Sequence, residues 1–571
     1  MKDQGFVVAL VLALVFSVSA AEAQGQAPRY RTLNDRFEPP AVTTREAWTA
    51  RAHEVREHVL ASAGLLPMPA RTALNPVVFD EVRHSDYIVA KVYFESLPGF
   101  FVTGNLYRPV GAGPFPAVLS PHGHWPNGRL EHTAVTSIPG RAINLARQGV
   151  VVFSHDMIGY TDSRQLTHQF GGHRENLWGL SLGGLQLWNS IRALDFLETL
   201  PYVRRGGFGV TGESGGGTQT FLLGAVDDRV AVAAPVNMIS LHMQGGCLCE
   251  NLPGLRLDLT NVDIAATIAP RPLLMISATG DWTNETLEVE YPAMRRIYGL
   301  FDADERVRAV RMTAEHNYNK DSREAMYAWM ARWLQHAPDA PTRAEGDFTP
   351  DKATDLLVFY GRPLPDGAIT ADVLIDRWIA AAKAQLAGAD PAVLESALRH
   401  ALGYGTAPAP APAPPARHRP SVLLASARPD LEPALRRAGI DVTPVTFTPF
   451  DDAAAGAIRH FETYNRTAAS QRVADIVEAV RRSPSSVLVA DGDAALAARL
   501  AAAIVPVRRA ILDVSGFDTA SDAAFLDRLY IPGIRRAGDF QTAARMARGE
   551  VFLHADSPPL TAAQIVALVR K

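Results

Sequence analysis

The chain has 571 residues, of which 47% are hydrophobic and 20% are charged. These values are typical of a soluble globular protein, and they exclude a disordered chain, a collagen-like chain or a polytopic membrane protein. The 56 lysines and arginines nearly balance the 60 acidic residues, giving a net charge of −4, so no basic footprint for nucleic acid is expected. The length predicts two or three domains, each large enough to bury a core.

Residues 1–23 have the pattern of a secretory signal peptide. Lys2 precedes an apolar run over residues 6–20, and Ala21-Glu22-Ala23 supplies a cleavage site of the A-x-A type. An uncleaved membrane anchor is the alternative, but the run is short for a span and no stop-transfer segment follows it. We therefore expect a protein that is exported, to the periplasm or the extracellular space, with no membrane anchor after cleavage.

Residues 24–336 are predicted to form one α/β domain. An amphipathic helix is expected over 44–64, followed by an antiparallel pair of strands over 87–94 and 101–107. Short apolar runs without alternation come next, and helical stretches separate them, which indicates a mostly parallel sheet with helices on both faces. These runs cover residues 117–120, 150–154, 208–211, 230–235, 273–277 and 307–312, and the clearest helices cover 180–200 and 322–336. Asp321 is expected to cap the last helix.

A second, smaller and degenerate α/β domain is predicted over residues 417–571. Residues 337–416 would connect the two domains, being helical over 369–402 and then an extended Ala/Pro-rich linker over 407–415. Buried strands of the second domain are expected at residues 421–425, 487–490 and 509–514. Where a nucleophile would follow the middle strand, the sequence reads Asp491-Gly492-Asp493-Ala494, so this domain is expected to be non-catalytic.

The strongest chemical signal is the segment Gly212-Glu213-Ser214-Gly215-Gly216, which follows the predicted strand 208–211 and enters a helix. A serine on a sharp turn from strand to helix stands exposed above the helix N-terminus, and small neighbours relieve the crowding there. An ordinary glycine-rich turn or a phosphate loop is the alternative, but a phosphate loop would carry a lysine beside the serine or threonine. We predict that Ser214 is a nucleophile.

A serine hydroxyl needs a general base and an acid that orients the base. Asp281 lies just past the predicted strand 273–277, and His316 lies in the loop after the next strand. Because the carboxyl ends of parallel strands meet at one edge, both side chains should reach Ser214. We predict that His316 acts as general base and then acid, with Asp281 orienting its imidazole. Glu250, in the loop after an earlier strand, is the rival acid.

Two backbone N–H groups are predicted to stabilise an oxyanion. One belongs to Gly215, directly after the nucleophile, and the other to His124, in the loop Pro121-His122-Gly123-His124-Trp125. Side chains expected to border the site and contact substrate are Trp125, Trp178, Glu250 and Trp282. The tryptophans could stack on a sugar ring or simply line the pocket wall.

The sequence offers few ligands for a metal ion. Cys247 and Cys249 are the only cysteines, too few for a disulfide scaffold or a four-cysteine zinc site. A bridge within Cys-x-Cys closes a strained ring, which favours free thiols. His122 and His124 could form an H-x-H pair, but no third ligand stands at a suitable spacing, so no metal is predicted.

These motifs resemble the α/β-hydrolases related to dienelactone hydrolase, and within them the bacterial acetyl xylan esterase-like proteins, relatives of the prolyl-oligopeptidase catalytic domain. The resemblance covers about residues 80–336 and rests on the segments 114–124, 156–159, 212–216 and 270–281. It implies the α/β-hydrolase fold, carboxylic ester hydrolysis through an acyl-enzyme and no cofactor. The positions that match the family's triad and oxyanion hole are Ser214, Asp281, His316, His124 and Gly215.

The sequence differs from this family in three places. Glycine follows Ser214 where acetyl xylan esterases often carry glutamine, and the segment 245–254 is not part of their pattern. The C-terminal domain is an addition. These differences leave the prediction of hydrolase chemistry in place, but they weaken the prediction of specificity for xylan acetyl groups.

The expected function is therefore that of an exported serine esterase whose substrate is an acetyl or uronic-acid ester of a plant polysaccharide. A peptidase of the prolyl-oligopeptidase kind is one alternative, but such enzymes usually carry an upstream β-propeller, for which the chain has no room. A catalytically inactive carbohydrate-binding protein is another, and it predicts that a member of the triad is missing.

Overall fold

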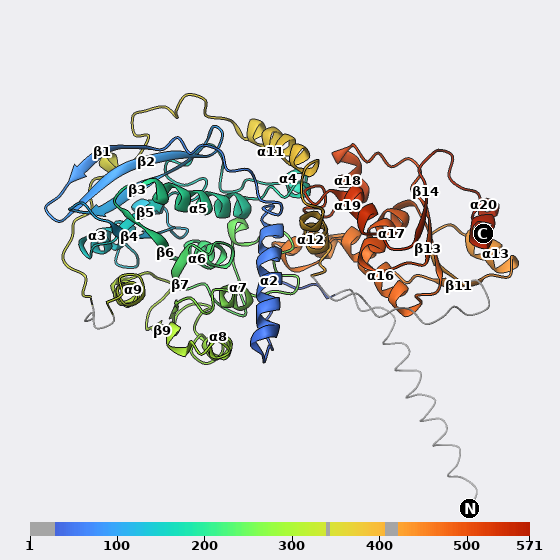
Figure 1. The fold of residues 1–571 in the computed structure, drawn as a ribbon, viewed down its shortest axis with the longest axis horizontal. Helices are drawn as coiled ribbons and strands as arrows, with labels where there is room; N and C mark the ends of the chain where they lie inside the picture. The colour runs from blue at the N-terminus through green and yellow to red at the C-terminus, as the bar shows by residue number, and fades with distance from the viewer. Residues whose placement is uncertain (1–28, 338–342, 406–420) are drawn as a thin grey trace, which may run out of the picture.

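The computed structural model describes residues 29–337, 343–405 and 421–571. The predicted signal peptide and the predicted Ala/Pro-rich linker lie outside these residues. In the described ranges, no helix combines the length and the hydropathy needed to cross a membrane. The chain forms a larger α/β domain, a helical connector and a smaller α/β domain (Figure 1).

A nine-stranded sheet is the centre of the larger domain, in the order β1-β2-β3-β5-β4-β6-β7-β8-β9. The pairs along β1-β2-β3-β5 are antiparallel, whereas all the pairs from β5 to β9 in this order are parallel. The strands are β1 (Val77–Arg83), β2 (Tyr87–Leu97), β3 (Phe100–Pro109), β4 (Phe115–Leu119), β5 (Val151–His155), β6 (Val203–Glu213), β7 (Val230–Val236), β8 (Leu273–Ala278) and β9 (Val307–Met312). The prediction of an α/β-hydrolase sheet is confirmed; only β1, a largely exposed edge strand, was not predicted.

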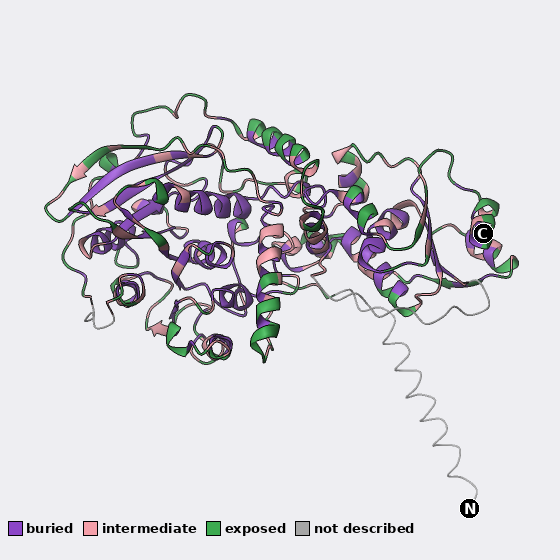
Figure 2. Ribbon diagram, in the orientation of Figure 1, coloured by how far each residue is buried: buried purple, intermediate pink, exposed green. Residues whose placement is uncertain are grey.

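Helices cover both faces of this sheet (Figure 1). On one face, α5 (Leu182–Thr199), α6 (Gly215–Val226) and α8 (Glu290–Gly299) contact the strands, and α2 (Arg45–Ser62) and α7 (Asn261–Ala266) pack against α6. The other face packs against α3 (Ile138–Arg147) and α9 (Lys320–Trp333). In Figure 2, α5 and α6 are buried almost throughout. Burial on both faces explains why β4, β5, β7 and β8 are nearly continuous apolar runs.

The cap of α9 differs from the prediction. Asn319, not Asp321, caps this helix, and its side chain accepts a hydrogen bond from the Ser322 N–H at 3.1 Å. The helix begins at Lys320, two residues earlier than a cap at Asp321 allows. Asp321 therefore lies in the first turn, where a carboxylate interacts favourably with the helix dipole.

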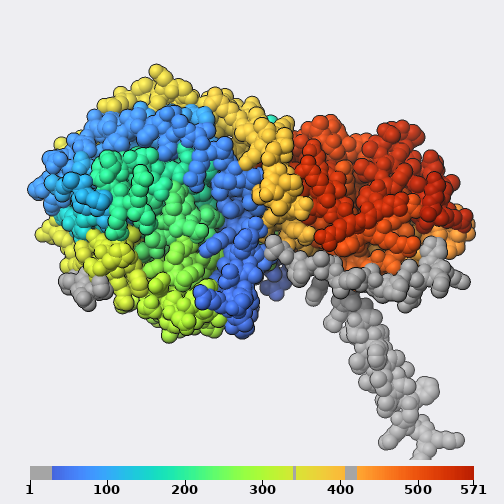
Figure 3. Space-filling view, viewed as in Figure 1, coloured from blue at the N-terminus to red at the C-terminus, as the bar shows by residue number. Residues whose placement is uncertain are grey.

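The connector packs back onto the larger domain instead of standing free. Its helices are α10 (Ala353–Leu356), α11 (Ala371–Leu386) and α12 (Pro391–Ala401). The N–H of Ile369 donates to the Gly99 carbonyl at 3.1 Å, and the indole of Trp378 donates to the Trp178 carbonyl at 2.9 Å. Figure 3 shows this segment, in yellow and orange, lying along the larger domain up to the smaller one.

The smaller domain holds a five-stranded parallel sheet in the order β11-β10-β12-β13-β14. Its strands are β10 (Ser421–Ala425), β11 (Asp441–Pro444), β12 (Val487–Asp491), β13 (Arg509–Asp513) and β14 (Glu550–His554). Its helices are α13 (Leu431–Arg437), α14 (Asp452–Gly456), α15 (Phe461–Tyr464), α16 (Ala468–Arg482), α17 (Gly492–Ile504), α18 (Asp522–Arg528), α19 (Asp539–Met546) and α20 (Ala562–Arg570). The predicted second α/β domain is confirmed, and Gly492 occupies the turn from β12 to α17 where a nucleophile would stand.

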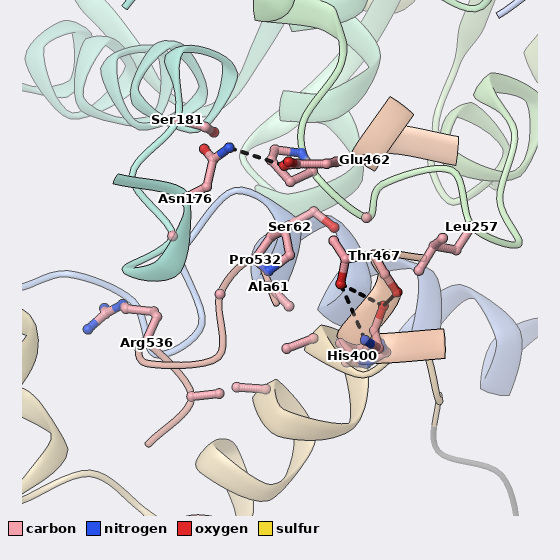
Figure 4. Close-up of a pocket in the computed structure, with 18 of the residues that line it drawn as sticks. Ala61, Ser62, Asn176, Ser181, Leu257, His400, Glu462, Thr467, Pro532 and Arg536 are labelled. Carbon is pink, nitrogen blue, oxygen red and sulfur yellow. Dashed lines mark hydrogen bonds between the residues drawn. The ribbon is translucent and has the colours of Figure 1, made fainter. Parts of the chain in front are cut away.

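Polar contacts join the two domains. The buried Arg536 donates to the Gly64 carbonyl at 3.1 Å. Asn176, just before the C-terminal end of α4 (His173–Leu177), donates to the Glu462 carboxylate at 3.3 Å, as Figure 4 shows. The cavity drawn there is only about 40 Å³ and contains none of the predicted catalytic residues.

A buried histidine at the end of β5 should make folding sensitive to acid. Burial lowers the pKa of His155 to about 4, whereas an unfolded histidine titrates near 6.5. As the pH falls from about 6.5 toward 4, His155 becomes protonated in the unfolded chain but stays neutral in the folded chain. The free energy of unfolding therefore decreases over this range. Between about pH 7 and pH 4.5, urea unfolding of wild type should show a loss roughly 2 kcal/mol larger than that of His155→Phe.

The control for this measurement is His53→Gln, which removes an exposed imidazole and should lose as much stability as wild type. An equal loss in His155→Phe and wild type would contradict the assignment of the acid sensitivity to His155.

Candidate active site

Ser214 stands on a strained turn between β6 and α6. Its φ of 55° and ψ of −124° define a backbone conformation that residues other than glycine rarely adopt. The turn is held on both sides, because the Ser214 N–H donates to the Val236 carbonyl at 3.1 Å and the Ser214 carbonyl accepts from the Thr218 N–H at 3.0 Å. Strain of this kind is typical of a serine nucleophile exposed above a helix N-terminus.

The loop after β4 packs directly against this turn. A Cβ on Gly212 would come within 2.4 Å of the Pro121 carbonyl oxygen, so only glycine fits there. A Cβ on Gly123 would lie 3.2 Å from Ser214 Cβ. The loop that carries His124 therefore lies beside Ser214, as the sequence predicts.

His316 is paired with Asp281. The distance from His316 Nδ1 to Asp281 Oδ2 is 2.9 Å, and the Asp281 side chain is 3% exposed. The other oxygen, Asp281 Oδ1, accepts from the Thr283 N–H at 2.7 Å and from its hydroxyl at 2.5 Å. With Nδ1–H donating to the carboxylate, Nε2 is the atom of His316 that can accept a proton.

Two indoles lie against the His316 ring. Trp282 stacks on it with ring centroids 4.7 Å apart, and the Trp125 ring lies 6.2 Å away. The Trp125 indole nitrogen also lies 3.0 Å from the position of a Cβ on Gly123, beside Ser214. Among the described residues no hydrogen bond joins Ser214 to His316; such catalytic bonds often tighten only when substrate is bound.

Glu250 has a different partner. Its Oε2 accepts the N–H groups of Gly246 at 2.8 Å and Cys247 at 2.9 Å. The carboxylate therefore braces its own loop, and the acid that contacts His316 in this structure is Asp281. The same two hydrogen bonds engage the Glu250 carboxylate within its own loop, which argues against its predicted role in substrate binding.

The two amides predicted for the oxyanion hole are available for a ligand. In the described part of the chain, neither the Gly215 N–H nor the His124 N–H donates to a protein acceptor. Gly215 is the first residue of α6, where N–H groups have no partner within the helix and the dipole favours negative charge.

His122 anchors the loop and is not available as a metal ligand. Its Nδ1 lies 2.7 Å from the Gly123 carbonyl oxygen, and its Nε2 accepts the Met157 N–H at 3.0 Å. Burial lowers the pKa of His122 to about 3, which keeps the ring neutral. The H-x-H pair considered from the sequence therefore does not form.

Trp178 does not border the site, contrary to the prediction. It is 1% exposed, and its indole N–H lies 3.1 Å from both carboxylate oxygens of Asp522 in the smaller domain. The guanidinium of Arg535 lies over its ring at 4.9 Å. Trp178 follows α4 at the junction of the two domains, a position that only the packing of the second domain reveals.

The sequence did not predict that three further side chains lie next to the oxyanion loop. His168, Cys247 and Cys249 surround the imidazole of His124, and both cysteines are free thiols. They lie on separate loops, after β5 and β7, so no spacing along the chain could have indicated that they meet.

A buried ion pair supports the residue before the nucleophile. Glu213 is fully buried; one oxygen accepts from Arg141 Nη1 at 2.7 Å and the other from the Trp125 indole at 2.7 Å. Arg141 is also buried, and its guanidinium lies 4.5 Å from the ring of Tyr318. The pair connects the nucleophile turn to the indole beside His316.

Arg141→Met should lower the free energy of unfolding by about 3–5 kcal/mol, because Glu213 would remain as a buried charge without its cation. Guanidinium unfolding measures the effect. Arg295→Met, which breaks an exposed ion pair with Asp304, should cost less than about 1 kcal/mol. Equal stability of Arg141→Met and wild type would show that Glu213 does not depend on this partner.

Comparisons with known proteins agree with the fold. No protein-family model matches the chain. The Bacillus subtilis protein named "Putative hydrolase YtaP" is 25% identical over 261 residues, which are 42% of this chain and 84% of that protein. The solved structure of "Methylesterase BT1017" is 29% identical with a TM-score of 0.52, and the match covers 60% of this chain and 78% of that one.

A glucuronoyl esterase from Solibacter usitatus is more distant, at 17% identity and a TM-score of 0.40 over 55% of this chain and 100% of that one. The chain is a hydrolase with the α/β-hydrolase fold, and it is similar to the esterases of that fold, which confirms the resemblance drawn from its motifs.

Proposed function

We propose that this chain is a serine esterase that hydrolyses carboxylic esters through an acyl-enzyme. The observation that carries the proposal is the combination of a strained, positive-φ Ser214 with a His316–Asp281 pair 2.9 Å apart. These are the parts that an acyl-transfer site with a serine nucleophile requires.

In the first half of the reaction, Ser214 Oγ attacks the ester carbonyl carbon and gives its proton to His316 Nε2. The oxyanion of the tetrahedral intermediate accepts hydrogen bonds from the N–H groups of Gly215 and His124. When the intermediate collapses, the ester C–O bond breaks and the alcohol leaves with the proton from His316. Asp281 holds the imidazole in the required tautomer and stabilises the imidazolium.

In the second half, water attacks the acyl-enzyme. His316 takes a proton from the water, a second oxyanion forms in the same place, and collapse returns the proton to Ser214 Oγ. The carboxylic acid product then leaves, and the site is restored without any cofactor.

For the substrate, we propose an acetyl or uronic-acid ester of a plant polysaccharide. The similarity to a protein named as a methylesterase supports an ester with a small alcohol or acyl group. Trp125 and Trp282 lie against His316 and offer aromatic faces on which a sugar ring can stack. Export to the periplasm or the extracellular space, which the N-terminal pattern predicts, would bring the enzyme to such polymers.

A product screen tests the substrate class. The full chain is incubated with acetylated xylan, methyl-esterified pectin and methyl glucuronate, and acetate, methanol and free uronic acid are assayed. We expect one of these esters to be cleaved by wild type and not by Ser214→Ala. Cleavage of peptides but of none of these esters would favour a peptidase, and no cleavage of any substrate would favour a binding protein.

A further inference from the structure

Two imidazoles and two thiols from three loops, one of them the proposed oxyanion loop, lie close together. We call them the Cys2His2 cluster: His124, His168, Cys247 and Cys249. One ligand atom from each lies within 4.8 Å of the other three, and His124 Nε2 lies 3.1 Å from Cys249 Sγ. Cys249 is buried and the other three are partly buried.

The topology of the sheet brings these loops together. His124 follows β4, His168 lies in the loop after β5, and the two cysteines follow β7. These strands lie within the run β5-β4-β6-β7 and are parallel, so their carboxyl ends share one edge. The cluster therefore stands at the same edge as Ser214.

We propose that the Cys2His2 cluster binds one zinc ion, which no comparison assigns to this chain. Zinc in such a site lies about 2.3 Å from sulfur and about 2.0–2.1 Å from nitrogen, with tetrahedral geometry. These bond lengths place neighbouring ligand atoms roughly 3.3–3.8 Å apart. The spacing in the cluster needs a contraction of no more than about 1.5 Å to reach that range.

The imidazole of His168 is oriented to present a ligand atom. Its Nδ1 lies 2.6 Å from the Ile158 carbonyl oxygen and must donate to it. The ring is therefore in the tautomer whose Nε2 carries a lone pair, and among the described residues this buried Nε2 has no hydrogen-bond partner. A backbone carbonyl that fixes the tautomer in this way is the usual outer contact of a zinc-binding histidine.

The cysteine loop is also held in place. The Cys247 N–H donates to Glu250, and the Cys247 carbonyl accepts from Asn251 Nδ2 at 2.8 Å. Two residues of α15 in the smaller domain hold Asn251 in turn: the Thr463 hydroxyl donates to its carbonyl at 3.0 Å, and the Tyr464 hydroxyl to its Oδ1 at 3.0 Å. The second domain thus braces the loop that supplies both sulfurs.

The donor set selects the metal and its role. Thiolate and imidazole ligands suit zinc, whereas calcium and magnesium require oxygen ligands. Four protein ligands complete a tetrahedron and leave no position for substrate, so the ion is structural. On binding, each thiol loses its proton to solvent, and two sulfur–zinc and two nitrogen–zinc bonds form with no change in oxidation state.

The ion would fix the oxyanion loop, a role that rests on the proposed esterase function. A Cβ on Gly215 would lie 2.6 Å from His124 Cε1, so the imidazole rests directly on the residue after the nucleophile. Holding that imidazole on zinc would hold the neighbouring His124 amide as well. Misplacing one oxyanion donor typically lowers kcat by about 100- to 1,000-fold.

Metal content and cobalt spectroscopy test the site in the full-length protein. After equilibration with Zn²⁺ and dialysis, wild type should retain one zinc per chain by elemental mass spectrometry. After chelation and addition of Co²⁺, it should show the thiolate charge-transfer and tetrahedral ligand-field bands. His168→Gln and Cys249→Ser should weaken zinc binding by at least about 100-fold, whereas His173→Gln, which removes an exposed imidazole outside the cluster, should bind as wild type does.

The cobalt bands are measured on wild type, so this part of the test holds even if a variant fails to fold. Wild type without stoichiometric zinc, cobalt bound without thiolate bands, or an intact mass showing a Cys247–Cys249 disulfide would overturn the zinc site. Stoichiometric zinc with thiolate bands in a chain that cleaves no ester would support the site and refute the esterase proposal. Full esterase activity of the zinc-free protein would refute the role in holding the oxyanion loop.

Discussion

Ser214→Ala is expected to lower kcat for ester hydrolysis by about a millionfold, while the protein remains folded. The hydroxyl is the only group on the strained turn that can form the acyl-enzyme, and neither His316 nor the amides of Gly215 and His124 can replace it. The measurement is steady-state hydrolysis of the best ester from the product screen, together with labelling by a fluorophosphonate probe.

Two results would decide the assignment. Wild type should react with the fluorophosphonate and Ser214→Ala should not, whereas Ser396→Ala on α12, outside the site, should react and turn over as wild type does. Turnover by Ser214→Ala near the wild-type rate would remove Ser214 as the nucleophile, even if the chain proved to be an esterase.

Asp281→Asn is expected to lower kcat by about 10,000-fold. The amide that replaces the carboxylate could donate to His316 Nδ1, which would favour the tautomer whose Nε2 already carries a proton and cannot accept one from the serine. Glu250→Gln should keep kcat within about tenfold of wild type, because the Glu250 carboxylate contacts backbone N–H groups of its own loop. Kinetics of the two variants, measured side by side, compare the two acids.

The opposite ranking would contradict the geometry. If Asp281→Asn retained turnover and Glu250→Gln lost it, the His316–Asp281 contact of 2.9 Å would be a structural pair and the acid of the reaction would lie on the loop after β7. Circular dichroism and thermal unfolding of both variants distinguish lost chemistry from lost folding.

Much of the larger domain could be predicted from the chain. Strands buried on both faces must be apolar throughout, so β4, β5, β7 and β8 stand out as short continuous runs. The turn at Ser214 was also readable, since a serine between glycines, after a strand and before a helix, is a local pattern. Chain order then restricted the base and the acid to a few positions.

The prediction of Trp178 failed for a physical reason. Its distance from the site depends on where α4 ends and on how the smaller domain packs, through Asp522 and Arg535. The cap of α9 depended on a two-residue difference in the start of the helix, which a periodic pattern does not resolve.

By itself, the sequence determined the two α/β domains, the strained serine turn and the candidates for base and acid, because these are encoded in local patterns and in the order of the strands along the chain. Only the tertiary structure decided that Asp281 rather than Glu250 contacts His316, and that His124, His168, Cys247 and Cys249 form one cluster. These contacts join residues up to 125 positions apart, as between His124 and Cys249. Residues so far apart in the sequence come into contact only because the carboxyl ends of the parallel strands lie at one edge of the sheet.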